Sequence, residues 1–122
     1  MAEKKVVYVV SGDPFEHVEN VSAVFAQALT AVSFGHETSI YLMDNAVNIA
    51  KKDGVKGAKF TSFEPIETML ENFIEMEGTV FVCHPSSDAR GLHEADCIDG
   101  VKFVNASALV SAGIEADALF TF

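Results

Sequence analysis

The residues with the clearest potential for chemistry lie between Thr79 and Gly91, where the sequence reads TVFVCHPSSDARG. Cys83 stands where a short apolar run gives way to a polar turn. A parallel sheet presents the carboxyl ends of its strands, and the helix N-termini that follow them, to ligands. A thiolate placed there is a nucleophile, whereas a thiol that closes a buried strand is a small inert apolar residue. The sequence leaves both interpretations of Cys83 open.

Three polar neighbours bear on the chemistry of Cys83. A helix is expected to begin just after it, and a helix N-terminus combined with a nearby cation favours the thiolate. Arg90 supplies that cation, while His84 and Ser86 lie in the same turn. We therefore predict that Arg90, His84 and Ser86 stabilise an anion on Cys83, although a strand-end neighbour such as His84 can point away from the thiol.

Two further loops would share this edge of a parallel sheet. Gly12, Asp13 and His17 follow the first apolar run, and Asp44 and Asn45 follow the second. Loops at strand ends carry many ligand contacts, so these five residues form a possible ligand loop, with solvated turns as the ordinary alternative. Neither a Walker phosphate loop nor G-x-G-x-x-G follows the first run, which leaves nucleotide binding unsupported.

The histidines and cysteines raise the question of a metal site. Cys83, His84, His93 and Cys97 fall within one short segment, yet none of the common zinc spacings is present. We expect no metal and no other cofactor. A Ser-His-Asp hydrolase is also unsupported, because the sequence lacks the G-x-S-x-G elbow.

Five apolar runs alternate with helical patterns and must position these residues. The expected strands are 5–10, 38–43, 79–82, 101–104 and 118–122. The expected helices are 16–34, 46–52, 65–78, 89–95 and 107–112, the fourth capped by Ser86, Ser87 or Asp88 and the fifth stopped by Gly113. This alternation predicts an α/β fold, a three-layer α/β/α sandwich with a mostly parallel sheet of about five strands, flavodoxin-like in general architecture.

Composition restricts the partners. The chain has 122 residues, enough for one domain, and a net charge of −10 with scattered lysines, which argues against nucleic acid. Its hydrophobic share is 49%, in short interrupted runs that do not suit a membrane span. The start of the chain lacks the long apolar region of a signal peptide, so we expect a cytoplasmic protein with free thiols. So many apolar residues in so small a chain suggest an oligomer.

The segment from Cys83 to Val101 resembles the DsrE/DsrF-like (DsrEFH-like) sulfur-relay family, whose closest pattern is C-x-x-C-x-x-x-R-G followed by an acidic D-L-I-D-G-V-type run. This chain has Cys83, Ser86, Arg90 and Gly91 at those steps, then D-C-I-D-G-V. A G-D-P loop, a Gly-His that leads into a strand, an Asp-Asn-Ala-Val and a closing A-D-A-L-F-T-F extend the likeness.

The resemblance implies a single α/β/α domain over 1–122 that forms homotrimers or hexamers. In members with the cysteine it implies transfer of sulfane sulfur through a cysteine persulfide, with Cys83 in the persulfide position and Arg90 and Gly91 in the turn after it. Ser86 replaces the second cysteine, so a local redox pair is absent. Cys97 replaces an apolar residue, which favours a buried structural thiol over a resolving partner.

The leading hypothesis is a small cytoplasmic sulfur carrier or sulfurtransferase that takes sulfur onto Cys83 from a donor and passes it to an acceptor, each a protein or a small thiol. The alternative is a non-catalytic oligomeric domain that binds a small molecule or another protein. A peroxiredoxin-like thiol reductase is a third hypothesis, and it would require a disulfide between Cys83 and Cys97.

Overall fold

Strand β1 (Lys5–Val10) lies between β2 (Glu37–Leu42) and β5 (Ala118–Thr121) in a sheet whose strand order is β4-β3-β2-β1-β5, with β3 at Thr79–Cys83 and β4 at Val101–Val104. All four strand pairs are parallel in the computed structural model, which describes residues 3–122. The predicted α/β fold is therefore confirmed. Its strand order differs from the 2-1-3-4-5 order of flavodoxin, so the likeness to flavodoxin is one of layers.

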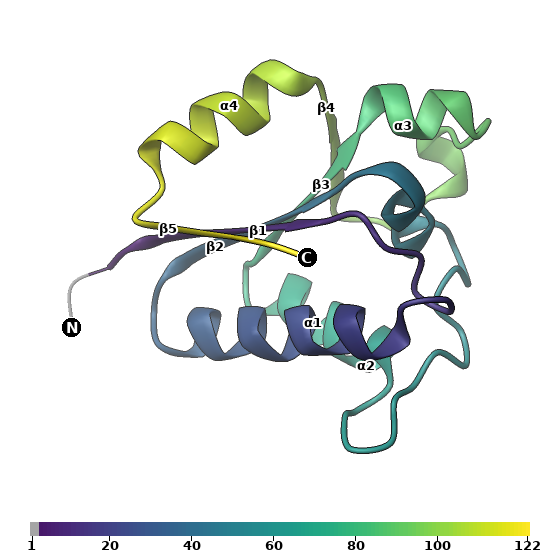
Figure 1. Ribbon diagram of the computed structural model, residues 1–122, viewed down its shortest axis with the longest axis horizontal. Coiled ribbons are helices and arrows are strands. Elements are labelled where there is room, and N and C mark those ends of the chain that lie inside the picture. Colours follow the sequence, from purple (N-terminus) through teal and green to yellow (C-terminus); the bar gives the residue numbers. More distant parts are fainter. Residues whose placement is uncertain (1–2) are drawn as a thin grey trace.

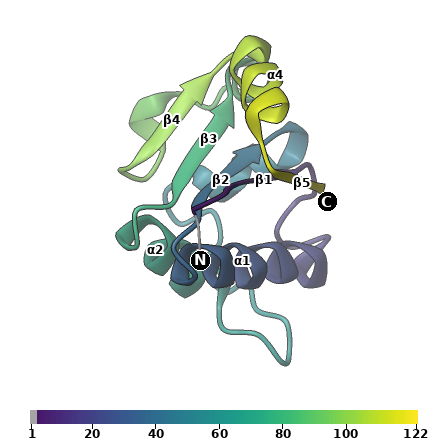
Figure 2. The same cartoon turned by 90° about the vertical axis from the view of Figure 1, so that its left-hand side faces the viewer.

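Helices cover both faces of this sheet. The helical elements are α1 (Val18–Ser33), η1 (Asp44–Ala50, 3₁₀), α2 (Ile66–Glu75), α3 (His84–Ala89), η2 (Glu94–Asp96, 3₁₀) and α4 (Ala106–Glu115). Helices α1 and α2 lie side by side below the sheet, and α4 lies above it (Figures 1 and 2). No helix within residues 3–122 is long and apolar enough to cross a membrane.

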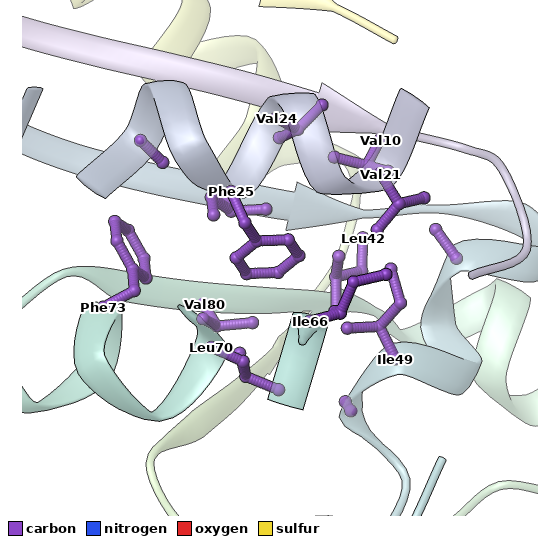
Figure 3. Packing of buried hydrophobic residues seen from close by; sticks show 14 of the residues in the cluster. Val10, Val21, Val24, Phe25, Leu42, Ile49, Ile66, Leu70, Phe73 and Val80 are labelled. Carbon is purple, nitrogen blue, oxygen red and sulfur yellow. The ribbon is translucent and has the colours of Figure 1, made fainter. Parts of the chain in front are cut away.

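The main core lies between the sheet and helices α1 and α2. Successive side chains of a strand point to opposite faces, and on β3 this alternation sends Val80 and Val82 into the core, where both are fully buried. Phe25 of α1 and Phe73 of α2 belong to the same core cluster and are drawn with Val80 in Figure 3. Truncating a buried phenylalanine to alanine costs about 3–5 kcal/mol, so this layer holds the sheet in place.

The layer on the opposite face is thin. Helix α4 has ten residues, and none of them is fully buried. Val110 and Ile114 turn outward from it, with 60% and 80% of their surfaces exposed. Below α4, the rings of Tyr41 and Phe81 stack with centroids 4.5 Å apart. One short helix therefore shields part of this face and leaves apolar side chains in solvent.

The segment after Cys83 differs from its prediction. The prediction of a helix over 89–95 is wrong, because α3 begins at His84 and ends at Ala89. Pro85 suits the first turn of a helix, and Gly91, at φ +67°, turns the chain into a conformation that continues no helix. The serines expected to cap the later helix lie within α3 instead.

Two other helix predictions are wrong in detail. Helix α4 runs through Gly113 to Glu115, although Gly113 was expected to stop it. The short helix expected over 46–52 is a 3₁₀ helix that begins at Asp44, whose φ of 50° reverses the chain after β2. The five strands match their predicted runs to within one residue at each end.

Candidate functional site

Cys83 closes β3 and serves as the N-cap residue of α3. Its side chain is partly exposed. By the alternation along β3 it shares a face with Phe81, the face covered by α4, and it pairs in register with Val104 of β4. At an N-cap position the free N–H groups of the first helical turn favour a negative charge. The thiol thus stands at a strand end, open to solvent on the less protected side of the sheet.

A small cavity opens beside this thiol, and we call it the thiol cavity. Its volume is about 90 Å³. The ends of β2, β3 and β4 and the starts of α3 and α4 contribute its lining residues, which are Tyr41, Leu42, Met43, Cys83, Pro85, Val104, Asn105, Ala106 and Leu109. Among them only the thiol of Cys83 and the phenol of Tyr41 are titratable. A small apolar chamber with one nucleophile on its wall is the result.

A hydrogen-bonded cluster lies at the same edge of the sheet, and we call it the Arg90 clamp. The guanidinium of Arg90 donates to Asn45 Oδ1 from Nε at 3.1 Å and from Nη2 at 2.9 Å, and from Nη1 to the Ser86 carbonyl oxygen at 3.0 Å. The Asp44 N–H donates to Ser86 Oγ at 3.0 Å. These four residues join the turn after β2 to the helix after β3.

The clamp changes the roles expected for Arg90 and Ser86. In the described part of the chain, the side-chain hydrogen bonds of Arg90 go to Asn45 and Ser86 and none goes to Cys83. The hydroxyl of Ser86 likewise serves the backbone of Asp44. Both residues therefore position α3, whose first residue follows Cys83 directly.

The remaining predicted site residues lie apart from the thiol cavity. The ring of His84 packs edge-on against Phe103, with centroids 6.3 Å apart. Asp13 Oδ1 accepts the N–H groups of Phe15 and Glu16, at 2.8 and 3.1 Å, in the turn that leads into α1. Gly12 and His17 adjoin each other in that same turn, and neither they nor Asp13 line the cavity.

Cys97 is a different kind of thiol. It is 4% exposed and belongs to the main core cluster. Burial raises the pKa of the Cys97 thiol, the carboxylates of Asp96 and Glu94 raise it further, and Lys52 offsets part of the effect. A high pKa keeps the thiol protonated and unreactive. Cys97 does not line the thiol cavity, and both cysteines are free.

Sequence reasoning missed most of the cavity wall. Tyr41 and Met43 lie on the α4 face of β2 and at its end, and Leu109 reaches the cavity from α4. The alternation along β2 places Tyr41 on the same face as Phe81, a signal that was readable in the sequence. The sequence does not predict that Leu109 lines the cavity, because this depends on where α4 crosses the sheet.

Within residues 3–122 no three His, Cys, Asp or Glu side chains gather as a metal site.

Comparison with known proteins relates this chain to one family along its length. A model of the DsrE/DsrF-like family matches residues 4–122. An uncharacterized protein of Methanocaldococcus jannaschii is 38% identical over 95 residues, which span 78% of this chain and 80% of that protein. Protein YchN of Escherichia coli K12 is 30% identical over 121 residues, which span 98% of this chain and 99% of YchN.

Solved structures of other proteins have the same fold as this chain. The crystal structure of YchN aligns with a TM-score of 0.73 and 24% identity, covering 99% of this chain and 100% of YchN. A protein of unknown function from Methanobacterium thermoautotrophicum aligns with a TM-score of 0.78 and 13% identity, covering 98% of this chain and 100% of that one. At these identities the alignments establish the fold alone.

The Arg90 clamp should be measurable as a coupling energy. We expect Asn45→Ala and Arg90→Ala each to lower the free energy of unfolding by about 1 kcal/mol or more, since both remove the two hydrogen bonds between these side chains and Arg90→Ala also removes the bond to the Ser86 carbonyl oxygen. The double variant should lose clearly less than the sum of the two. Urea unfolding of the four proteins measures this, with Lys56→Ala as a control for loss of an exposed cation outside the clamp. Strictly additive losses would contradict the clamp.

The buried thiol should make stability depend on pH. Because the pKa of Cys97 is raised in the folded state, the unfolded chain releases this proton near about pH 8.5 while the folded chain keeps it. The contribution of this thiol to the free energy of unfolding is therefore constant below that pH and falls above it. We expect the free energy of unfolding to fall more steeply between about pH 8 and 10 in the wild type than in Cys97→Ala. Tyr8 and Tyr41, whose pKa values burial also raises, are present in both proteins. Parallel curves would rule out the effect.

Proposed function

Since the chain belongs to the DsrE/DsrF-like family, we propose that it is a cytoplasmic sulfur carrier or sulfurtransferase that accepts sulfane sulfur as a persulfide on Cys83 and passes it to an acceptor thiol. The observation that carries the proposal is the placement of Cys83. It is a partly exposed thiol at the carboxyl end of β3 and at the N-cap of α3, on the wall of a small cavity.

The transfer is a balanced exchange. The Cys83 thiolate attacks the outer sulfur of a donor R–S–SH, a bond forms between Sγ and that sulfur, and the donor S–S bond breaks. The electron pair leaves on R–S⁻, so the products are Cys83–S–SH and R–S⁻. Unloading is the same reaction with an acceptor thiolate as the attacking group. No outside oxidant or reductant is needed, as in thiol–disulfide exchange.

The residues around Cys83 take supporting roles in this proposal. The Arg90 clamp holds α3 against the turn after β2 and so fixes the direction in which the thiol points. Ser86 supplies an acceptor oxygen to the clamp and cannot form a disulfide with Cys83. The carrier therefore works with one thiol, and Cys97 stays protonated in the core.

We also propose that the protein assembles as a homotrimer or hexamer. Val110 and Ile114 of α4 are exposed apolar side chains, and Leu119 of β5, which is 42% exposed, approaches the same helix at Gly113. They supply exposed apolar surface on the thin side of the sheet. Exposed apolar patches of this kind mark interaction surfaces. The same patch supports the alternative function, an interaction domain without catalysis, if Cys83 proves unreactive.

The carrier function is tested by loading the protein with sulfur. We expect incubation with polysulfide, followed by removal of excess reagent, to add one sulfur atom per chain in the intact mass. A thiol reductant should remove that atom. The adduct should be absent in Cys83→Ser and unchanged in the matched control Cys97→Ala, because only the thiol of Cys83 is accessible. An unmodified wild type with a demonstrably accessible Cys83 would favour the binding domain.

The assembly is tested by light scattering. We expect the wild type to have a mass of three or six chains, and Ile114→Asp to shift it toward the single chain, because a buried unpaired carboxylate disfavours the interface. Asn20→Asp adds the same charge to α1 on the opposite side of the sheet and should leave the mass unchanged. A monomeric wild type would contradict the assembly.

A further inference from the structure

The size of the thiol cavity limits what it can hold. Its volume is about 90 Å³, which is smaller than an apolar cavity of about 150 Å³ that binds benzene in another protein. The space next to Cys83 therefore suits a small group. A sulfur atom attached to Sγ, with a few further atoms during exchange, matches this room. A folded peptide or a bulky cofactor does not.

The lining of the cavity limits the charge of its occupant. Tyr41 is the only titratable side chain there besides Cys83, and burial raises its pKa, so its hydroxyl stays neutral. That hydroxyl donates to the Ala108 carbonyl oxygen at 3.4 Å. Arg90 is the basic residue nearest to Cys83 in the sequence, and its guanidinium donates its hydrogen bonds to Asn45 and Ser86. Burying an ion without a partner costs far more than burying a neutral group, so this wall favours an uncharged occupant.

We propose that the thiol cavity admits only small sulfur donors and acceptors that carry no charge besides that of the exchanging sulfur. This inference rests on the carrier function proposed above. It disfavours anionic donors such as thiosulfate, which would bring a charge against Met43, Val104 and Leu109.

Unloading brings one negative charge to the cavity, that of the acceptor thiolate. An acceptor thiolate R–S⁻ attacks the outer sulfur of Cys83–S–SH, the new bond joins the two, and the bond from the outer sulfur to Sγ breaks. The electron pair returns to Sγ as the Cys83 thiolate, and the outer sulfur leaves as R–S–SH with its proton. The exchange moves one negative charge from the acceptor sulfur to Sγ, and a second charge on the acceptor would have to be buried against the apolar wall without a partner.

Two alkylating reagents of nearly equal size test this inference, because iodoacetamide is neutral and iodoacetate is an anion. The persulfide on Cys83 is formed in a Cys97→Ala background and reacted with each reagent, in the folded protein and in urea. The net charge is similar in both states, so the urea sample corrects for general repulsion. We expect the ratio of the iodoacetamide rate to the iodoacetate rate to be roughly tenfold higher in the folded protein.

Variants of α4 connect that ratio to the cavity. Leu109→Lys places an ammonium group on the cavity wall and should bring the ratio down toward its value in urea. Ser107→Lys adds the same group to an exposed position of α4 outside the cavity and should leave the ratio unchanged. Circular dichroism checks that each variant folds, and Leu109→Gln, an uncharged polar change, replaces Leu109→Lys if the latter does not.

The outcomes separate the two proposals. Failure of polysulfide to add sulfur to Cys83 would remove the carrier function itself. Addition of sulfur with equal rate ratios in the folded and unfolded states would leave the carrier function standing and overturn the exclusion of charged groups by the cavity. A wild-type ratio in a folded Leu109→Lys would overturn it as well. A high ratio that only the Leu109 variant loses supports it.

Discussion

The burial of Val80 and Val82 between the sheet and helices α1 and α2 is the constraint on which the candidate site depends. Both side chains are fully buried, and a shift of β3 by one residue would expose them and bury their polar or reactive neighbours. Because side chains alternate along a strand, this burial also fixes Cys83 on the opposite face. Packing in the main core thus holds the Cys83 thiol in register on the opposite face of the sheet.

The two faces of the sheet are covered to different extents. The face that α1 and α2 cover packs against large apolar side chains such as Phe25 and Phe73, which have no exposed surface (Figure 3). The face under α4 carries one short helix, the thiol cavity and an exposed apolar patch at Ile114. This thin layer leaves the Cys83 thiol partly exposed and leaves apolar side chains of α4 in solvent. Closer covering by α4 would have filled the cavity and removed both.

The sequence predicts the sheet well because its strands are continuous β-branched and aromatic runs that suit burial on both faces. It also predicts that Cys83 ends a strand just before a helix. It fails at α3, since Pro85 in the first turn and the left-handed Gly91 place that helix earlier than the serine caps suggested. The clamp and the cavity wall were out of reach, because Asn45 and Leu109 join the site only through tertiary packing.

Ser86 shows how one substitution sets the kind of chemistry available. The resembling pattern has a second cysteine at this step, and a thiol there would offer Cys83 a disulfide partner. A serine removes that partner, and its hydroxyl accepts the N–H of Asp44, a residue whose φ of 50° holds the turn after β2 in a strained form. Sulfur is a weaker acceptor than a hydroxyl oxygen, so the serine also strengthens the clamp. The loss of a redox pair and the fixing of α3 are consequences of the same atom, and they favour a rigid single-thiol site over a cycling dithiol.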